Sequence, residues 1–176
     1  MAKDGTNRGG ARPGAGRKKK ALVDRIEQGR KAVVLEVPDI DVPEMPDVKE
    51  YLKAEQRMGE LCAEEIYKET WEWLRERGCA EFVSPMLLEQ YAMSAGRWVQ
   101  LEGMISEYGF ASRNNGNGAS LVAAPFVSMA QAYMKQSNQL WYQIFQIVKE
   151  NCSTTYSGGT PQDDVMERLL KAREGK

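Results

Sequence analysis

The chain has 176 residues, 28% of them charged, and its net charge is only −1. This length suffices for one domain with a core of three or four helices. There is no histidine, and the three cysteines have no metal-ligand spacing, which argues against a zinc site, a disulfide framework and histidine-based catalysis. No apolar run approaches the roughly 18 residues that a membrane span requires. We therefore expect a soluble protein with no metal, cofactor or membrane partner.

The charge is unevenly distributed along the chain. Residues 1–20 carry seven basic side chains and one acidic side chain, a net of +6, which leaves −7 for residues 21–176. An acidic body with a basic arm is typical of a protein that contacts a polyanion through the arm. Because residues 1–20 are rich in glycine and poor in large apolar side chains, we expect them to be disordered in the free protein. The alternative is a tail that only aids solubility.

Residues 21–46 connect the arm to the rest of the chain. Residues 21–31 have the pattern of a short helix, with Leu22, Val23 and Ile26 on one side. Residues 32–46 contain three prolines, which disfavour helix, so we expect an extended segment there. It is either a strap laid across the surface or a plain linker.

A first long helix is predicted from about Asp47 to Arg77, with Asp47 as its N-cap and Gly78 after its end. Its apolar positions recur at helical spacing, and its other side is rich in Glu and Lys. Tryptophans at helical spacing are more often core or subunit contacts than base-stacking platforms. We expect that role for Trp71, Trp73 and Trp98.

The centre of the chain is predicted to be an antiparallel helical hairpin. Ser84-Pro85 is a helix start signal, and the helix that follows should end near Tyr108-Gly109. Residues 113–118 have the composition of a loop. A second helix, with apolar residues at spacings of three and four, should begin around Pro125 and run to about residue 150.

The last segment is predicted to be a polar linker over residues 151–159 followed by a helix to about Arg173. Thr160 and Pro161 give a second start signal. A free helix of this length is poorly populated, so it must dock on its own core, on a neighbouring subunit or on another protein. Its apolar side includes Val165, Leu169 and Leu170.

These patterns together predict an all-α fold. The expected divisions are a disordered basic arm (1–20), a short helix and extended strap (21–46), a helical core (47–150), and a linker with a short amphipathic helix (151–176). No serine lies in a nucleophile-elbow motif, no cysteine has a candidate base, and the carboxylates have the spacing of a solvated helix face. We therefore expect no enzymatic activity, no catalytic residues and no metal site.

Two stretches resemble phage terminase small subunits, most closely the P27-type family. The first is the leader RGGARPGAGRK, residues 8–18. The second runs from Trp71 to Val148, with an aromatic helix end, the segment LLEQYAMSAGRWVQLEGMISEYG, a glycine–asparagine loop and a proline-started helix. The resemblance covers roughly residues 50–150 and the leader. The chain departs from the family after the hairpin, where it has NCSTT at residues 151–155.

The resemblance implies a non-enzymatic, ring-forming subunit of a genome-packaging motor in the cytoplasm of the infected bacterial host. Such a subunit binds double-stranded viral DNA, delivers it to the large terminase subunit and modulates that partner's ATPase and nuclease. The residues expected to contact DNA are Arg8, Arg12, Arg17, Lys18, Lys19 and Lys20, with Lys135, Lys149 and Arg113 as weaker candidates. Those expected at subunit interfaces are Trp98, Tyr133, Trp141 and Phe145. Those expected to bind a partner are Val165, Leu169 and Leu170.

Two other functions fit parts of the pattern. One is a helical scaffold or adaptor protein whose basic tail binds nucleic acid. The other is a small DNA-binding regulator, but the only short helix pair near the arm is interrupted by Pro38 and Pro43, so no helix-turn-helix is predicted.

Overall fold

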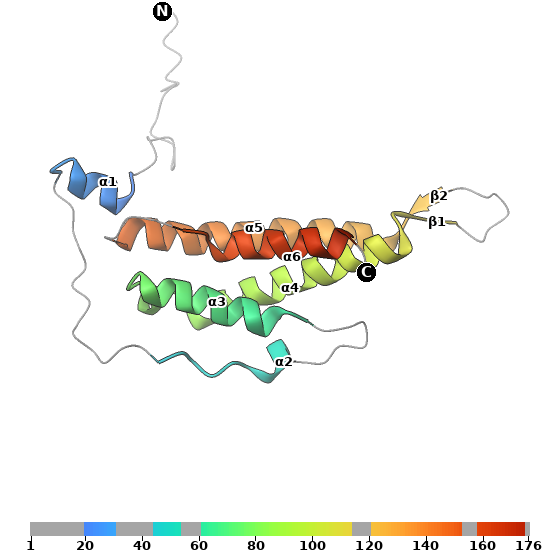
Figure 1. The fold of residues 1–176 in the computed structure, drawn as a ribbon, viewed down its shortest axis with the longest axis horizontal. Helices are drawn as coiled ribbons and strands as arrows, with labels where there is room; N and C mark the ends of the chain where they lie inside the picture. The colour runs from blue at the N-terminus through green and yellow to red at the C-terminus, as the bar shows by residue number, and fades with distance from the viewer. Residues whose placement is uncertain (1–19, 31–43, 54–60, 114–120, 153–157, 175–176) are drawn as a thin grey trace, which may run out of the picture.

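The computed structural model describes residues 20–30, 44–53, 61–113, 121–152 and 158–174. These residues form six α-helices, a short 3-10 helix and a two-stranded sheet (Figure 1). The predicted all-α class is confirmed, with the small sheet as an addition.

The structure is built around the predicted antiparallel hairpin of α4 (Pro85–Tyr108) and α5 (Pro125–Asn151). Both helices begin with proline at the first turn, where its missing N–H leaves no hydrogen bond unmade. The Ser84 hydroxyl makes no capping bond; the Ser84 carbonyl instead accepts hydrogen bonds from the N–H groups of Leu87 and Leu88. The start signal at residues 84–85 is therefore confirmed in position, but the serine acts through its backbone.

A small β-hairpin joins the two long helices. α4 ends at Gly109, whose φ of 83° is easily reached only by glycine, and the chain then becomes extended. β1 (Ala111–Arg113) pairs antiparallel with β2 (Leu121–Ala123), and Ala111 lies opposite Ala123. From the sequence, a loop was predicted over residues 113–118, and no strand was predicted. Arg113 lies in a strand, while residues 114–118 lie outside the described part of the chain.

The predicted continuous helix from Asp47 to Arg77 is wrong. Residues 44–49 are not helical, α2 covers only Glu50–Lys53, and α3 (Ala63–Glu76) begins after a non-helical turn. α2 packs against both α3 and α4, and a segment continuous with α3 in one straight helix could not fold back onto it. The end of α3 agrees with the prediction, since Gly78 follows it with a φ of 62°. The short 3-10 helix η1 (Ala80–Phe82) then leads into α4.

Most buried aromatic side chains lie between α3, α4 and α5. Trp71, Trp73 and Trp98 are all buried, which confirms them as core residues. The Trp141 ring lies 5.5 Å from the Trp73 ring and 5.5 Å from the Tyr91 ring. Aromatic pairs at this spacing and tilt add to the stabilisation from burial alone.

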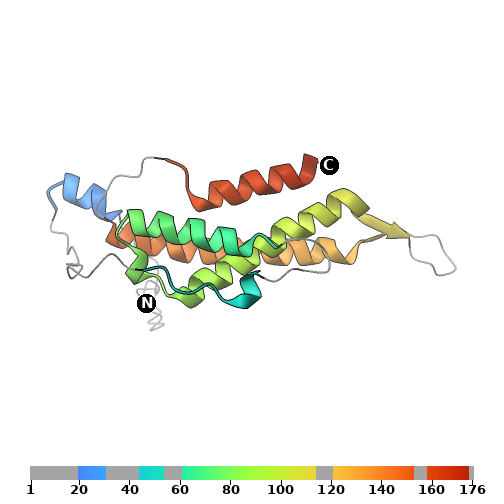
Figure 2. The same ribbon diagram turned by 60° about the horizontal axis from the view of Figure 1, so that its bottom comes forward.

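The two terminal helices pack on this core. In α1 (Leu22–Glu27), Leu22 and Val23 are buried against the bundle, whereas Ile26, expected on the same side, is exposed. α6 (Pro161–Glu174) runs alongside α3 and α4 (Figure 2). Its start is the one predicted, because the Asp163 carboxylate accepts hydrogen bonds from the Thr160 N–H at 2.7 Å and the Thr160 hydroxyl at 2.8 Å. Of the three docking options, α6 takes the chain's own core.

Candidate interaction surfaces

The root of the basic arm is fixed at one end of the bundle. Lys20 is described, and its Nζ donates a hydrogen bond to the Gln28 side chain at 2.9 Å; the other five predicted DNA-contacting residues lie outside the described part of the chain. α1 packs against α5, at the end where α5 finishes (Figure 1). A chain leaving Lys20 therefore starts from a defined position at that end.

The three weaker DNA candidates are not brought together. Lys135 is exposed midway along α5, and Lys149 is half-buried in its last turn. Arg113 belongs to β1, beyond the opposite end of α5. The structure therefore offers no clustered basic patch among these three.

The predicted interface residues divide into two groups. Trp98 is only 5% exposed and belongs to the chain's own core, so its side chain is not available to another subunit. Tyr133, Trp141 and Phe145 are half-buried on α5. The Phe145 ring lies 6.2 Å from Trp141, which extends the aromatic cluster toward the surface.

The β-hairpin and the end of α4 form an exposed apolar tip that was not predicted from the sequence. The exposed fractions are 58% for Tyr108, 74% for Phe110, 71% for Leu121 and 40% for Val122. A two-stranded sheet is marginal alone in water, and the described residues place no core beneath this one. Exposed apolar patches of this kind mark interaction sites. The only sequence signal was a short apolar run, Leu121-Val122-Ala123, before Pro125.

Polar contacts attach α6 to the bundle. The Arg168 guanidinium donates to the Glu65 carboxylate at 2.5 Å and to the Glu69 carboxylate at 2.6 Å. Arg173 pairs with Glu102 of α4 at 2.8 Å. The Tyr91 hydroxyl donates to Gln162 at 2.8 Å. Arg168 and Arg173 thus attach α6 to the neighbouring helices α3 and α4.

The predicted partner-binding residues of α6 are likewise partly buried and partly exposed. Val165 and Leu169 are buried in the chain's own core, which leaves them unavailable to a partner while α6 is docked. Leu170 is 58% exposed, and Met166, four residues earlier, is 47% exposed. This pair is defined here as the α6 stripe.

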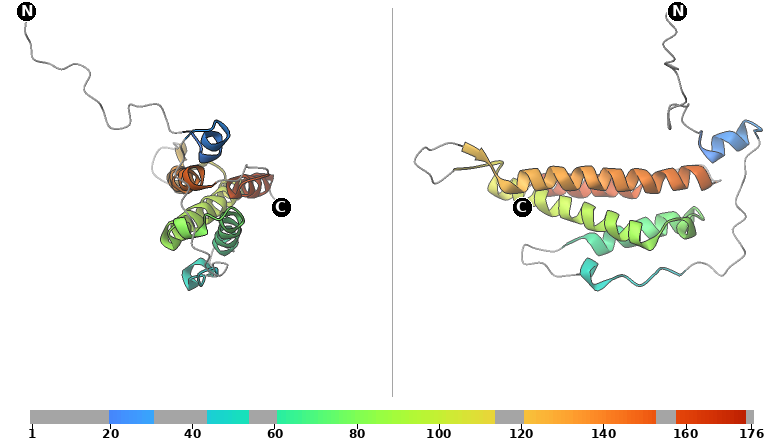
Figure 3. Two further views of the ribbon diagram at one scale, coloured as in Figure 1. Left: turned by 90° about the vertical axis from the view of Figure 1, so that its left-hand side faces the viewer. Right: turned by 180° about the vertical axis from the view of Figure 1, so that it is seen from behind.

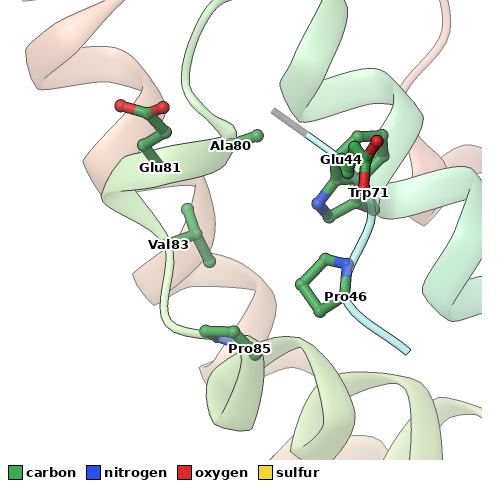
Figure 4. Close-up of a pocket in the computed structure, with 7 residues that line it drawn as sticks. All are labelled: Glu44, Pro46, Trp71, Ala80, Glu81, Val83 and Pro85. Carbon is green, nitrogen blue, oxygen red and sulfur yellow. The ribbon is translucent and has the colours of Figure 1, made fainter. Parts of the chain in front are cut away.

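A shallow cavity of about 300 Å³ lies where α3, η1 and the start of α4 meet (Figure 4). Its lining residues are mostly apolar: Pro46, Trp71, Ala80, Val83 and Pro85, with Glu44 and Glu81 as the acidic members. No nucleophile or basic side chain lines it, so the cavity lacks the groups that acyl or phosphoryl transfer needs.

The described titratable groups show no activated nucleophile. Burial raises the pKa of the Cys79 thiol to about 12, and the neighbouring Cys152 adds to this effect. Burial also raises the pKa of Tyr91 above its ordinary value. Both shifts keep the protonated, unreactive form at neutral pH. Within the described ranges, no three His, Cys, Asp or Glu side chains are grouped so that they could hold a metal ion.

Part of the chain matches the model of a known protein family. Residues 63–144 match the family described as phage terminase, small subunit. The match spans α3, both strands, α4 and most of α5, and it confirms the resemblance inferred from the sequence. Neither the comparison with curated proteins nor that with solved structures gives a match. In the part of the chain that the structure covers, no helix is long and apolar enough to cross a membrane.

Proposed function

We propose that this chain binds viral DNA, assembles as a ring and delivers the DNA to the large terminase subunit, because residues 63–144 match the family of phage terminase small subunits. The observation that carries this proposal is the family match over the helical hairpin and the helix that precedes it. The chain itself performs no chemistry in this role: it holds DNA and partners in position, and it modulates the ATPase and nuclease of the large subunit.

DNA binding is assigned to the basic arm. Its net charge of +6 contrasts with −7 for the remainder of the chain, so DNA approaching the body would be repelled and DNA approaching the arm attracted. The residues proposed to contact phosphates are Arg8, Arg12, Arg17, Lys18, Lys19 and Lys20. Such contacts give affinity without reading sequence.

Deletion of residues 1–20 tests this assignment. Each phosphate contact contributes about 0.9 to the slope of log K against log salt, so losing six contacts should lower the slope by about 5. Fluorescence anisotropy with a labelled duplex at several salt concentrations measures it. Lys49→Gln is the control, because Lys49 is exposed but lies outside the arm, and it should leave the slope nearly unchanged. An unchanged slope in the deletion variant, with normal helix content by circular dichroism, would show that the arm does not bind DNA.

Contact with the large subunit is assigned to the exposed hairpin tip. The tip lies at the end of the bundle remote from α1, the helix that follows the arm in the sequence (Figure 1). Its exposed Phe110 and Leu121 are suited to insertion into an apolar surface of a partner.

The double variant Phe110→Ser/Leu121→Ser should lose co-purification with the large subunit while the native mass of the small subunit stays unchanged. Met86→Ser is the control, because Met86 is similarly exposed, at 65%, but lies at the start of α4. Retained co-purification by the double variant would refute the assignment to the tip. It would leave the α6 stripe as the surface to test next.

A further inference from the structure

A long central part of this acidic protein contains no acidic residue. Between Glu107 and Glu150 lie 42 residues with three basic side chains and no Asp or Glu. Outside this stretch and the basic arm, residues 21–107 and 150–176 together carry a net charge of −10. The acid-free stretch contains β1, β2 and nearly all of α5.

The exposed side of α5 is accordingly almost uncharged. It presents Gln131, Lys135, Gln139 and Tyr142, and Lys135 is the only charged residue from Pro125 to Val148. Depletion of charge together with an exposed aromatic residue is the composition of a protein interface core. A single exposed lysine is too little charge for a DNA-binding face, for which several phosphate contacts are needed.

The other side of the bundle has the opposite character. α3 and α6 together carry nine acidic and five basic residues. Viewed end-on, α5 and α4 lie on one side of the bundle, and α6 and α3 on the other (Figure 3, left). The α6 stripe, Met166 and Leu170, supplies exposed apolar side chains on this acidic side.

We infer that the α5 face of one copy (Gln131, Lys135, Gln139, Tyr142) packs on the α6 stripe and its acidic surroundings in the next copy. The single charge of the α5 face, Lys135, is opposite in sign to the net charge around the α6 stripe, and Tyr142, Met166 and Leu170 offer exposed apolar surface for burial. Because they lie on different sides of one chain, the contact is head-to-tail, and repetition of a head-to-tail contact produces a closed ring when the rotation closes. This inference rests on the ring assembly proposed above and names the two faces that meet.

Paired variants test the inference by native mass spectrometry of the full chain. Lys135→Glu/Tyr142→Glu places acids on the α5 face, and Met166→Glu/Leu170→Glu places acids in the α6 stripe. Each variant alone should be monomeric, since one of its two faces is blocked. Mixed at equal concentration, they should form a one-to-one dimer and nothing larger, because only one pair of intact faces remains. This dimer also shows that both variants are folded.

Other outcomes separate the alternatives. If the α6 variant alone still assembles as the unaltered chain does, the α6 stripe is not part of the contact and the proposed pairing of faces is wrong. If both variants keep the mass of the unaltered chain, the two faces are not the interface, although ring assembly itself stands. If the unaltered chain is monomeric, ring assembly fails and this inference fails with it. The control Met86→Glu, at an exposed position outside both faces, should keep the mass of the unaltered chain.

Discussion

Two glycines in α4, Gly96 and Gly103, differ in how closely residues of neighbouring elements approach them. A Cβ built on Gly96 would lie 3.1 Å from Leu61 Cδ1, 3.2 Å from the Ala63 nitrogen and 3.3 Å from Ala63 Cβ. The backbone nitrogen cannot move aside as the end of a side chain can. Gly103, two turns later, has nothing within 4 Å of the same position.

Alanine substitutions at these two positions should therefore have opposite effects. Gly96→Ala should lower the free energy of unfolding by about 1–3 kcal/mol through overpacking. Gly103→Ala should raise it by about 0.5–1 kcal/mol, because alanine favours the helix and no contact opposes it. Urea denaturation of both variants measures the difference. Equal, stabilising effects would show that α4 does not approach the start of α3 this closely.

At the residue scale, the sequence predicted best which large aromatic side chains are buried. The three tryptophans at helical spacing are in the core as predicted. The sequence could not distinguish Gly96 from Gly103, because only the position of Leu61 and Ala63 across the bundle makes them different. It also assigned Trp98 to a subunit interface, although the chain's own helices bury it.

The start of α6 gives a prediction at the scale of one element. The hydrogen bonds from the Thr160 N–H and hydroxyl hold the pKa of the Asp163 carboxyl below its ordinary value. A lowered pKa in the folded state means that the carboxylate stabilises the fold above the ordinary Asp pKa of about 3.9, and that this contribution is lost as pH falls through the folded value.

Asp163→Asn should therefore destabilise the protein slightly at pH 7, by about 0.3–1 kcal/mol. The difference from the unaltered chain should shrink as pH falls below about 4 and through the lowered folded pKa of Asp163. Thermal unfolding of both proteins between pH 3 and pH 7 measures this. A difference that stays constant over the whole range would contradict a charged cap. Asp164→Asn is the matched control, since Asp164 has no such bonds to the Thr160 side chain or N–H.

Helices with strong start and stop signals were predictable, and weaker elements were not. The prolines at 85, 125 and 161 and the glycines at 78 and 109 mark helix ends within about a residue. The helix predicted from Asp47 was wrong because its apolar positions belong to two separate elements, α2 and α3, that pack against one another. The strands were missed because three residues are too few to show alternation.

At the scale of the whole molecule, the structure places four surfaces at different ends and sides of the bundle. Lys20 and α1 lie at one end, the apolar tip lies at the opposite end, and α5 and α6 form different sides (Figures 1 and 3). Sequence reasoning could not reach this arrangement, because it depends on where α6 docks. A rod with two different sides and two different ends is suited to a ring in which sides join subunits and ends meet other components.

The native mass of the full chain tests the central claim most directly. The account predicts a single species by native mass spectrometry at many times the chain mass of 19.8 kDa. Removing residues 1–20 should leave the number of subunits unchanged, since the subunit contacts proposed above lie on α5 and α6 and not on the arm. A monomer or a dimer for the unaltered chain would contradict the account, because neither can form a head-to-tail ring around or beside DNA.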